Sequence, residues 1–325
     1  MASIRDVALK AGVGIGTVSR ALNGTGYISE ETKRKIMEAV AELDYRPNEL
    51  AQNLYRNRSG VVGFMVPDLE HPFFSSLTKA IEMELYKHGY KCMICDVDRK
   101  QSREEEFLEM LQRNVMDGLI AGVDLMTDMD VSTIHRPIVT FDRNWGRMVP
   151  NIHSDHKRGG ELAAQALLNA GCKRVLQFTP EISSDMSFME RYHTLEQILR
   201  EHGVEVINIY TGKNQMGYDD DIRIAEVNAN YLREVDGIFA SDITAATCLR
   251  LAHQSGIRVP NQLHIISCDG LPFGRVLYPV LTSIRQNVPE IARACVNAVV
   301  KQMDGTRRVP MEQIIDVSFQ KGGTV

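Results

Sequence analysis

The sequence has no long uninterrupted apolar run, and this absence argues against a membrane span. Its first residues also lack the basic and then apolar pattern of a secretion signal. Cysteine is scarce, with six scattered over 325 residues. We therefore expect a reduced, cytoplasmic protein.

One pair of cysteines, Cys92 and Cys95, has the C-x-x-C spacing. The surrounding YKCMICD is typical of a strand, in which residues three apart point to opposite faces. We interpret the two cysteines as buried thiols and not as a redox pair.

The sequence also lacks a strong excess of charge, since the net charge is only −5. Residues 1–58 contain nine Lys and Arg against seven Asp and Glu, so this region is at +2 and the remainder at −7. A mildly basic N-terminal region before an acidic remainder is consistent with an N-terminal region that binds a polyanion. So small a difference in charge does not identify that polyanion as nucleic acid.

Three short helices are predicted within residues 3–45. Ser3 and Asp6 have capping-box spacing, and apolar residues then recur on one helical face. Ser29 is a good N-cap for the third helix, which Arg46-Pro47 ends. The following 48–60 segment predicts a helix of one or two turns, too short to be stable in water by itself.

The glycines of GVGIGTVSRALN admit two interpretations. A dinucleotide-binding loop needs G-x-G-x-x-G after a strand, whereas here the third glycine is one residue early and a helix precedes it. A helix-turn-helix needs a tight turn, which Gly12 suits, and a second helix with polar side chains. Thr17 and Ser19 can bond phosphate, and Arg20 can pair with guanine. We favour the helix-turn-helix.

From Val61 onward, strand-like runs alternate with amphipathic helical stretches. This alternation predicts parallel sheets in two lobes. Ligands in such folds bind beyond the carboxyl ends of the strands. Four segments follow predicted strands in this way: residues 68–74, 142–144, 241–242 and 269–270.

The chain as a whole resembles the LacI/GalR family of transcriptional regulators. The resemblance lies in IRDVALKAGVGIGTVSRALN, HPFF, DGLIAG, VTFDRN, FASD and CDGLPFGRVLYPVLTSIRQ, in the family's order. It implies an all-α helix-turn-helix head at 1–46, a hinge helix at 47–59, and an α/β core at 60–325 with two Rossmann-like lobes, as in periplasmic sugar-binding proteins. Lobe 1 would hold about 60–155 and 286–312, and lobe 2 about 156–285 and 313–325.

The resemblance implies DNA contacts from the second helix and the hinge. Gly14 stands where the family usually has a capping Ser, and Gly16 offers no side chain to a base, so readout leans on Ile15, Thr17 and Arg20. Leu54 would wedge into the minor groove. The full predicted set is Ile15, Gly16, Thr17, Ser19, Arg20, Asn23, Ala51 and Leu54.

The resemblance also implies an effector pocket, in which carboxylates and a guanidinium orient hydroxyls and a ring covers the apolar face. Thr194 replaces the usual glycine three residues after Arg191, and Gly270 stands where a second Asp is frequent. The predicted set is Phe73, Phe74, Asp142, Arg143, Arg191, Ser241 and Asp269. FDRN, ASD and CDG are similar to stretches of sucrose-type repressors, and Arg143 with Arg191 could alternatively hold a sugar phosphate.

We therefore expect a homodimeric repressor of carbohydrate-utilisation genes that a sugar or sugar phosphate releases from double-stranded operator DNA. A corepressor-dependent regulator and a sugar-binding receptor without a DNA role remain alternatives. We expect no catalytic activity, no cofactor and no metal. The one His/Asp cluster, His153 to His156, is better explained by Asp155 as a helix N-cap.

Overall fold

The computed structural model describes residues 2–24, 26–46, 58–97, 103–123, 131–181, 186–211, 217–305 and 309–325. The chain forms two compact units, Met1–Ser59 and Gly60–Val325. The predicted hinge residues Ala51 and Leu54 lie outside the described residues.

The N-terminal unit contains the three predicted helices. They are α1 (Ile4–Ala11), α2 (Ile15–Asn23) and α3 (Glu30–Glu42). The capping box forms as expected, because the Ser3 backbone N–H donates to the Asp6 carboxylate at 2.7 Å. Gly12 ends α1 at φ +68°, which turns the chain sharply into α2. Val7, Val18 and Ile36 are fully buried and form the centre of a small core.

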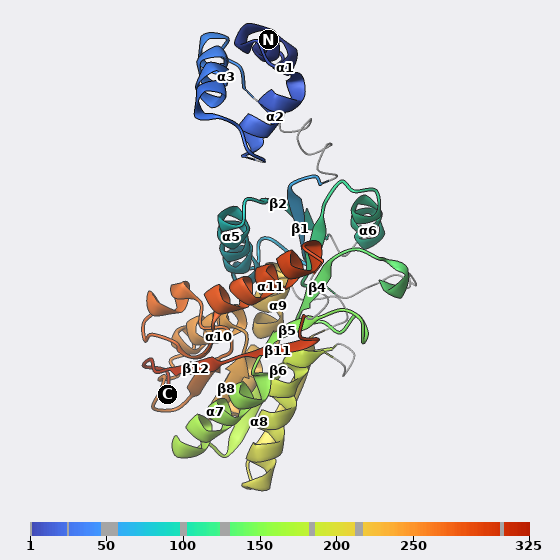
Figure 1. The fold of residues 1–325 in the computed structure, drawn as a ribbon. Helices are drawn as coiled ribbons and strands as arrows, with labels where there is room; N and C mark the ends of the chain where they lie inside the picture. The colour runs from blue at the N-terminus through green and yellow to red at the C-terminus, as the bar shows by residue number, and fades with distance from the viewer. Residues whose placement is uncertain are drawn as a thin grey trace. The chain divides into compact units, whose positions relative to one another are not determined.

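In the larger unit, the described residues form two six-stranded sheets (Figure 1). The first has the order β11-β5-β4-β3-β1-β2 and the second β12-β10-β9-β8-β6-β7. The first is built from β1 (Val61–Val66), β2 (Lys91–Asp96), β3 (Gly118–Ala121), β4 (Ile138–Phe141), β5 (Asn151–Ser154) and β11 (Glu312–Ile315). The second is built from β6 (Arg174–Pro180), β7 (Glu205–Thr211), β8 (Gly237–Ala240), β9 (His264–Ser267), β10 (Thr282–Gln286) and β12 (Val317–Gln320). The predicted parallel pairing is confirmed, with the antiparallel β10–β12 pair as an addition.

Helices cover both faces of each sheet, so each lobe is a three-layer sandwich. In Figure 1, α11 lies alongside α5 on one face of the first sheet, and α6 covers the other face. On the second sheet α7 and α8 share one apolar core, and α9 and α10 share the other. The bounds are α5 (Pro72–Lys87), α6 (Glu104–Gln112), α7 (His156–Asn169), α8 (Glu190–Glu201), α9 (Tyr218–Val227), α10 (Asp242–Gln254) and α11 (Val288–Met303). The described residues also form four short 3-10 helices: η1 (Val131–Thr133), η2 (Ser187–Met189), η3 (Ala229–Arg233) and η4 (Pro272–Arg275).

The chain crosses between the two sheets three times: from β5 to α7, from β10 to α11, and from β11 to β12. The expected end of lobe 1 at about residue 312 is too early. Residues 312–315 pair with β5 in the first sheet, so the last crossing falls at Asp316. Three short connections therefore join the two lobes. A ligand between the lobes would face the carboxyl ends of the strands.

Candidate functional site

The second helix of the head brings six predicted DNA-contacting residues together. Val18 is buried, whereas Ile15, Gly16 and Arg20 are exposed, and Thr17, Ser19 and Asn23 are half-buried. Gly14 is the N-cap and has no side chain with which to cap the helix.

The polar side chains of this helix are linked along its surface. The Arg20 guanidinium donates to the Gly16 carbonyl at 3.3 Å and to the Thr17 hydroxyl at 3.4 Å. The Asn23 amide donates to Ser19 at 3.3 Å. The helix therefore presents hydroxyl, amide and guanidinium groups together, and their contact with DNA remains a prediction.

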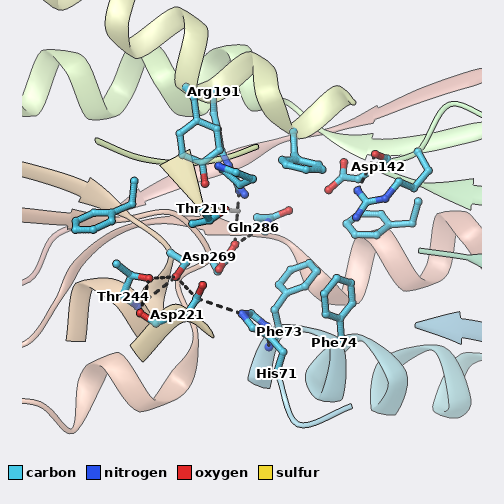
Figure 2. A pocket seen from close by; sticks show the side chains of 17 residues that line it. His71, Phe73, Phe74, Asp142, Arg191, Thr211, Asp221, Thr244, Asp269 and Gln286 are labelled. Carbon is cyan, nitrogen blue, oxygen red and sulfur yellow. Dashed lines mark hydrogen bonds and ion pairs between the residues drawn. The ribbon is translucent and has the colours of Figure 1, made fainter. Parts of the chain in front are cut away.

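A cavity of about 730 Å³, counted with its open mouth, lies between the two lobes. All seven predicted effector residues line it, and Figure 2 shows side chains of both lobes pointing into it. The other lining residues are His71, Phe141, Phe178, Pro180, Phe188, Tyr192, Thr211, Asp221, Thr244 and Gln286.

Asp142 is held by a histidine that the prediction did not include. The buried His156 ring contacts the Asp142 carboxylate at 2.7 Å through Nε2. Burial raises the pKa of Asp142, but His156 and then Arg143 more than offset it, and the pKa is lowered overall. The pKa of His156 is lowered overall, because burial, the largest cause, acts with Arg191 and His153 against the opposing effect of Asp142. A neutral His156 thus donates to an ionised Asp142, and the carboxylate keeps acceptor capacity for a ligand hydroxyl.

Arg191 is the cation at the back of the pocket. One guanidinium nitrogen donates to the Cys268 carbonyl at 3.1 Å and lies 3.6 Å from the Asp269 carboxylate. The guanidinium also packs over the rings of Tyr192 and Phe188, at 5.2 and 5.8 Å from their centroids. Its Nε and the Thr211 hydroxyl are buried with no hydrogen-bond partner among the described residues. Both residues line the cavity.

The approach of α8 to α7 explains how Thr194 is accommodated in place of the expected glycine. A Cβ on Gly160 would lie 2.5 Å from the Arg191 carbonyl oxygen and 2.9 Å from the Thr194 Cβ. The space is therefore provided by the glycine on α7, and Arg191 still lines the pocket.

Asp242 organises the loop that carries Asp269. Its carboxylate accepts the backbone N–H groups of Asp269 at 3.1 Å, Gly270 at 3.2 Å and Leu271 at 2.6 Å. Gly270 has φ +68°, and an added Cβ would lie 2.6 Å from the Arg285 Cα, so the aspartate frequent in the family does not fit here. The sequence signal for Asp242 is its place two residues after β8, at the start of α10.

We expect Asp242→Asn to destabilise the protein by about 1–3 kcal/mol and to weaken ligand binding, because an amide cannot accept the Leu271 N–H where its own NH₂ faces it. Burial, together with Asp269, raises the pKa of Asp242 to about 6, so the carboxylate is still mostly ionised at pH 7. Urea unfolding measures the loss, with the exposed Asp219→Asn on α9 as control. Equal midpoints for both variants would contradict this role.

Four other titratable residues noted in the sequence lie outside the pocket: Asp155, His153, Cys92 and Cys95. Asp155 caps α7 by accepting the Arg158 N–H at 2.9 Å, as predicted. His153 contacts Glu312 on the neighbouring strand at 3.1 Å. Cys95 is buried and Cys92 half-buried on β2, and burial raises the pKa of their thiols to about 12 and about 11. Within the described ranges no helix is both long and apolar enough to cross a membrane.

A helix-turn-helix head on a two-lobed core with a pocket between the lobes defines a ligand-responsive DNA-binding regulator. Residues 3–48 match the lacI family of bacterial regulatory proteins, and residues 164–325 match the periplasmic binding protein-like domain. The chain is 33% identical to the sucrose operon repressor of Streptococcus mutans over 100% of both chains. It is 32% identical to the ribose operon repressor of Halalkalibacterium halodurans, covering 94% of this chain and 91% of that one.

Among solved structures, the Lac repressor dimer bound to operator and the anti-inducer ONPF superimposes with a TM-score of 0.84 at 23% identity, covering 99% of this chain and 98% of that one. This likeness shows the same fold. The chain belongs to the LacI family of bacterial transcription regulators.

Proposed function

We propose that this protein is a homodimeric repressor that binds a near-palindromic operator and is released from it when a neutral sugar fills the pocket between the lobes. The observation that carries the proposal is the convergence of Asp142, Asp269 and Arg191 with aromatic rings around one cavity. Carboxylates and a guanidinium orient hydroxyls, while rings pack on the apolar face of a sugar. The sucrose and ribose operon repressors among its relatives support the same ligand class.

The charges of the pocket favour a neutral sugar over a sugar phosphate. Arg191 is already paired with Asp269, and Arg143 donates to the Asp142 backbone carbonyl at 3.1 Å beside its carboxylate. Asp221 adds a further acidic group to the lining. The two arginines therefore leave no surplus positive charge for a phosphate dianion.

Release follows from linkage between the pocket and the DNA-binding unit. A ligand shifts DNA affinity only if it favours one arrangement of the lobes over another. Arg191 and Asp269 belong to the second lobe, whereas Asp142 and Phe73 belong to the first. A sugar that bridges them changes the angle between the lobes, and the hinge segment predicted at 47–59 carries that change to the heads.

The test is a gel shift with an operator selected by the protein from a random duplex pool. We expect sucrose, D-fructose, D-ribose or D-glucose to lower operator affinity by about 5- to 150-fold, a coupling of about 1–3 kcal/mol. The 6-phosphates of fructose and glucose serve as comparison ligands and should act more weakly. A sugar that tightens the complex instead would identify corepression, and a protein that selects no sequence would contradict the DNA-binding role.

A further inference from the structure

Two polar residues that line the pocket, His71 and Asp221, face each other from different lobes. His71 is the N-cap of α5 in the first lobe, and Asp221 lies in the first turns of α9 in the second. Both are buried, both line the cavity, and Figure 2 marks the contact between them. Neither was among the predicted effector residues.

The contact is too long for a direct hydrogen bond. The His71 Nε2 lies 3.7 Å from the Asp221 Oδ2, beyond the usual range of N–H···O bonds. This separation leaves room for a ligand hydroxyl oxygen about 2.8 Å from each atom, which would accept from the histidine and donate to the carboxylate.

The proton on His71 is in the right place for that geometry. Its Nδ1 accepts the Phe73 backbone N–H at 3.3 Å, so in the neutral ring the proton is on Nε2. Burial lowers the pKa of His71, but Asp221, with Asp269 and Asp68 farther away, raises it more. Since Nε2 also carries a proton in the imidazolium form, it faces Asp221 as a donor in either charge state.

Asp221 is hydrogen-bonded to Ser241, a predicted effector residue that also lines the cavity. The Ser241 hydroxyl donates its one proton to the Asp221 carboxylate and accepts the Thr244 N–H at 3.2 Å, so it is held between α9 and α10. The Thr244 hydroxyl donates to the Asp221 carbonyl at 3.2 Å and fixes the backbone there. The Asp221 carboxylate is thus positioned by α10 with acceptor capacity left for a ligand.

A second contact beside the pair joins the same two segments. The Asp68 carboxylate accepts the Tyr218 backbone N–H at 3.2 Å, between the loop after β1 and the first residue of α9. The loop before His71 therefore contacts the second lobe three residues away from Asp221 in sequence.

We propose that His71 and Asp221 hold one hydroxyl of the effector between them and make the pocket selective for a sugar with a hydroxyl at that position. The proposal rests on the sugar-responsive function proposed above and adds a specificity-determining pair to it.

The test uses the full-length protein and calorimetric titration with sucrose, D-fructose, D-ribose and D-glucose, followed by deoxy analogues of the sugar that binds tightest. Asp221→Asn changes the acceptor with little change of shape. His71→Asn removes Nε2 but keeps a good N-cap for α5. The matched controls are the exposed Asp219→Asn on α9 and His88→Asn at the other end of α5, which should bind as the wild type does.

We expect each of the two variants to weaken binding of the parent sugar by about ten- to a hundredfold, the range for hydrogen bonds to charged groups. The double variant should be little weaker than the worse single one, because both residues bind the same hydroxyl. The deoxy analogue that lacks the hydroxyl bound by this pair should bind the wild type weakly. Its affinity should not fall further in the variants. A purely structural role would instead weaken all analogues alike.

The proposed role of the pair would be wrong if the variants bound the sugar as tightly as the wild type, or still bound every deoxy analogue more weakly than the parent sugar to the same extent. Neither outcome would contradict the sugar-responsive function. A wild type that binds none of the four sugars would overturn both. If Asp221→Asn does not fold by circular dichroism, the His71→Asn measurement decides alone.

Discussion

Arg191→Ala should abolish the response of operator binding to sugar while the protein still binds its operator in the absence of sugar. The substitution removes the guanidinium that pairs with Asp269 and whose Nε is without a partner among the described residues. Each charge-assisted hydrogen bond lost to a ligand removes about 1.5–3 kcal/mol, so affinity for the sugar should fall at least tenfold to a hundredfold. Operator contact comes from the other compact unit and should change by no more than a few-fold.

The measurement is a pair of titrations on the same preparation, one of sugar by calorimetry and one of operator by gel shift. Arg200→Ala is the matched control, because it removes the same group from the same helix, where Arg200 pairs with Glu196 at 2.7 Å outside the pocket. Arg191→Lys keeps the charge but loses the planar fork, so it should recover little of the response. Loss of operator binding by a folded Arg191→Ala would instead mean that the ligand is a corepressor or that the pocket is assigned wrongly.

Six of the seven predicted effector residues lie in segments that follow strands, whereas Arg191 lies on α8 and is predicted by the family resemblance alone. Asp142 comes directly after β4 and Asp269 two residues after β9, and the carboxyl ends of parallel strands share one edge of a sheet. Buried strands are also the strongest pattern in the chain, so the strand-like runs from Val61 onward lie in the two sheets.

What the sequence does not reveal depends on contacts between distant elements. His71 and Asp221 are ordinary residues for helix N-termini, and only the meeting of the two lobes makes them neighbours. The pairing of His156 with Asp142 likewise needs the first crossing to place α7 beside β4. A helix N-cap and a pocket residue have the same sequence signature, and the fold alone distinguishes them.

Two further differences have local causes that periodicity does not report. The final crossing falls at Asp316 because β11 and β12 run almost continuously in sequence while pairing in different sheets. Thr194 is tolerated because the glycine that α7 and α8 need for close approach is Gly160, 34 positions earlier in the chain and on the partner helix. Both depend on which elements pack together, which a single sequence does not specify.

Arg20→Ala should weaken binding to the selected operator by about 5- to 150-fold and relax the preference at one base pair in each half-site. The expectation follows if the guanidinium forks onto a guanine, a contact that contributes about 1–3 kcal/mol of discrimination. In the free protein this side chain is exposed on α2, held to Gly16 and Thr17 by bonds of 3.3 and 3.4 Å. These are long hydrogen bonds at the surface, so little opposes their exchange for contacts with a base.

The effect of Arg20→Ala is measured by fluorescence anisotropy on the operator and on duplexes changed at single positions, at fixed salt, because phosphate contacts vary with ionic strength. Arg34→Ala is the matched control, since it also removes one positive charge from the N-terminal unit, where Arg34 pairs with Glu38 on α3. It should weaken binding slightly and equally on all duplexes. If Arg20→Ala behaves in the same sequence-independent way, Arg20 contacts phosphate only, and base readout on this helix falls to Ile15 and Thr17.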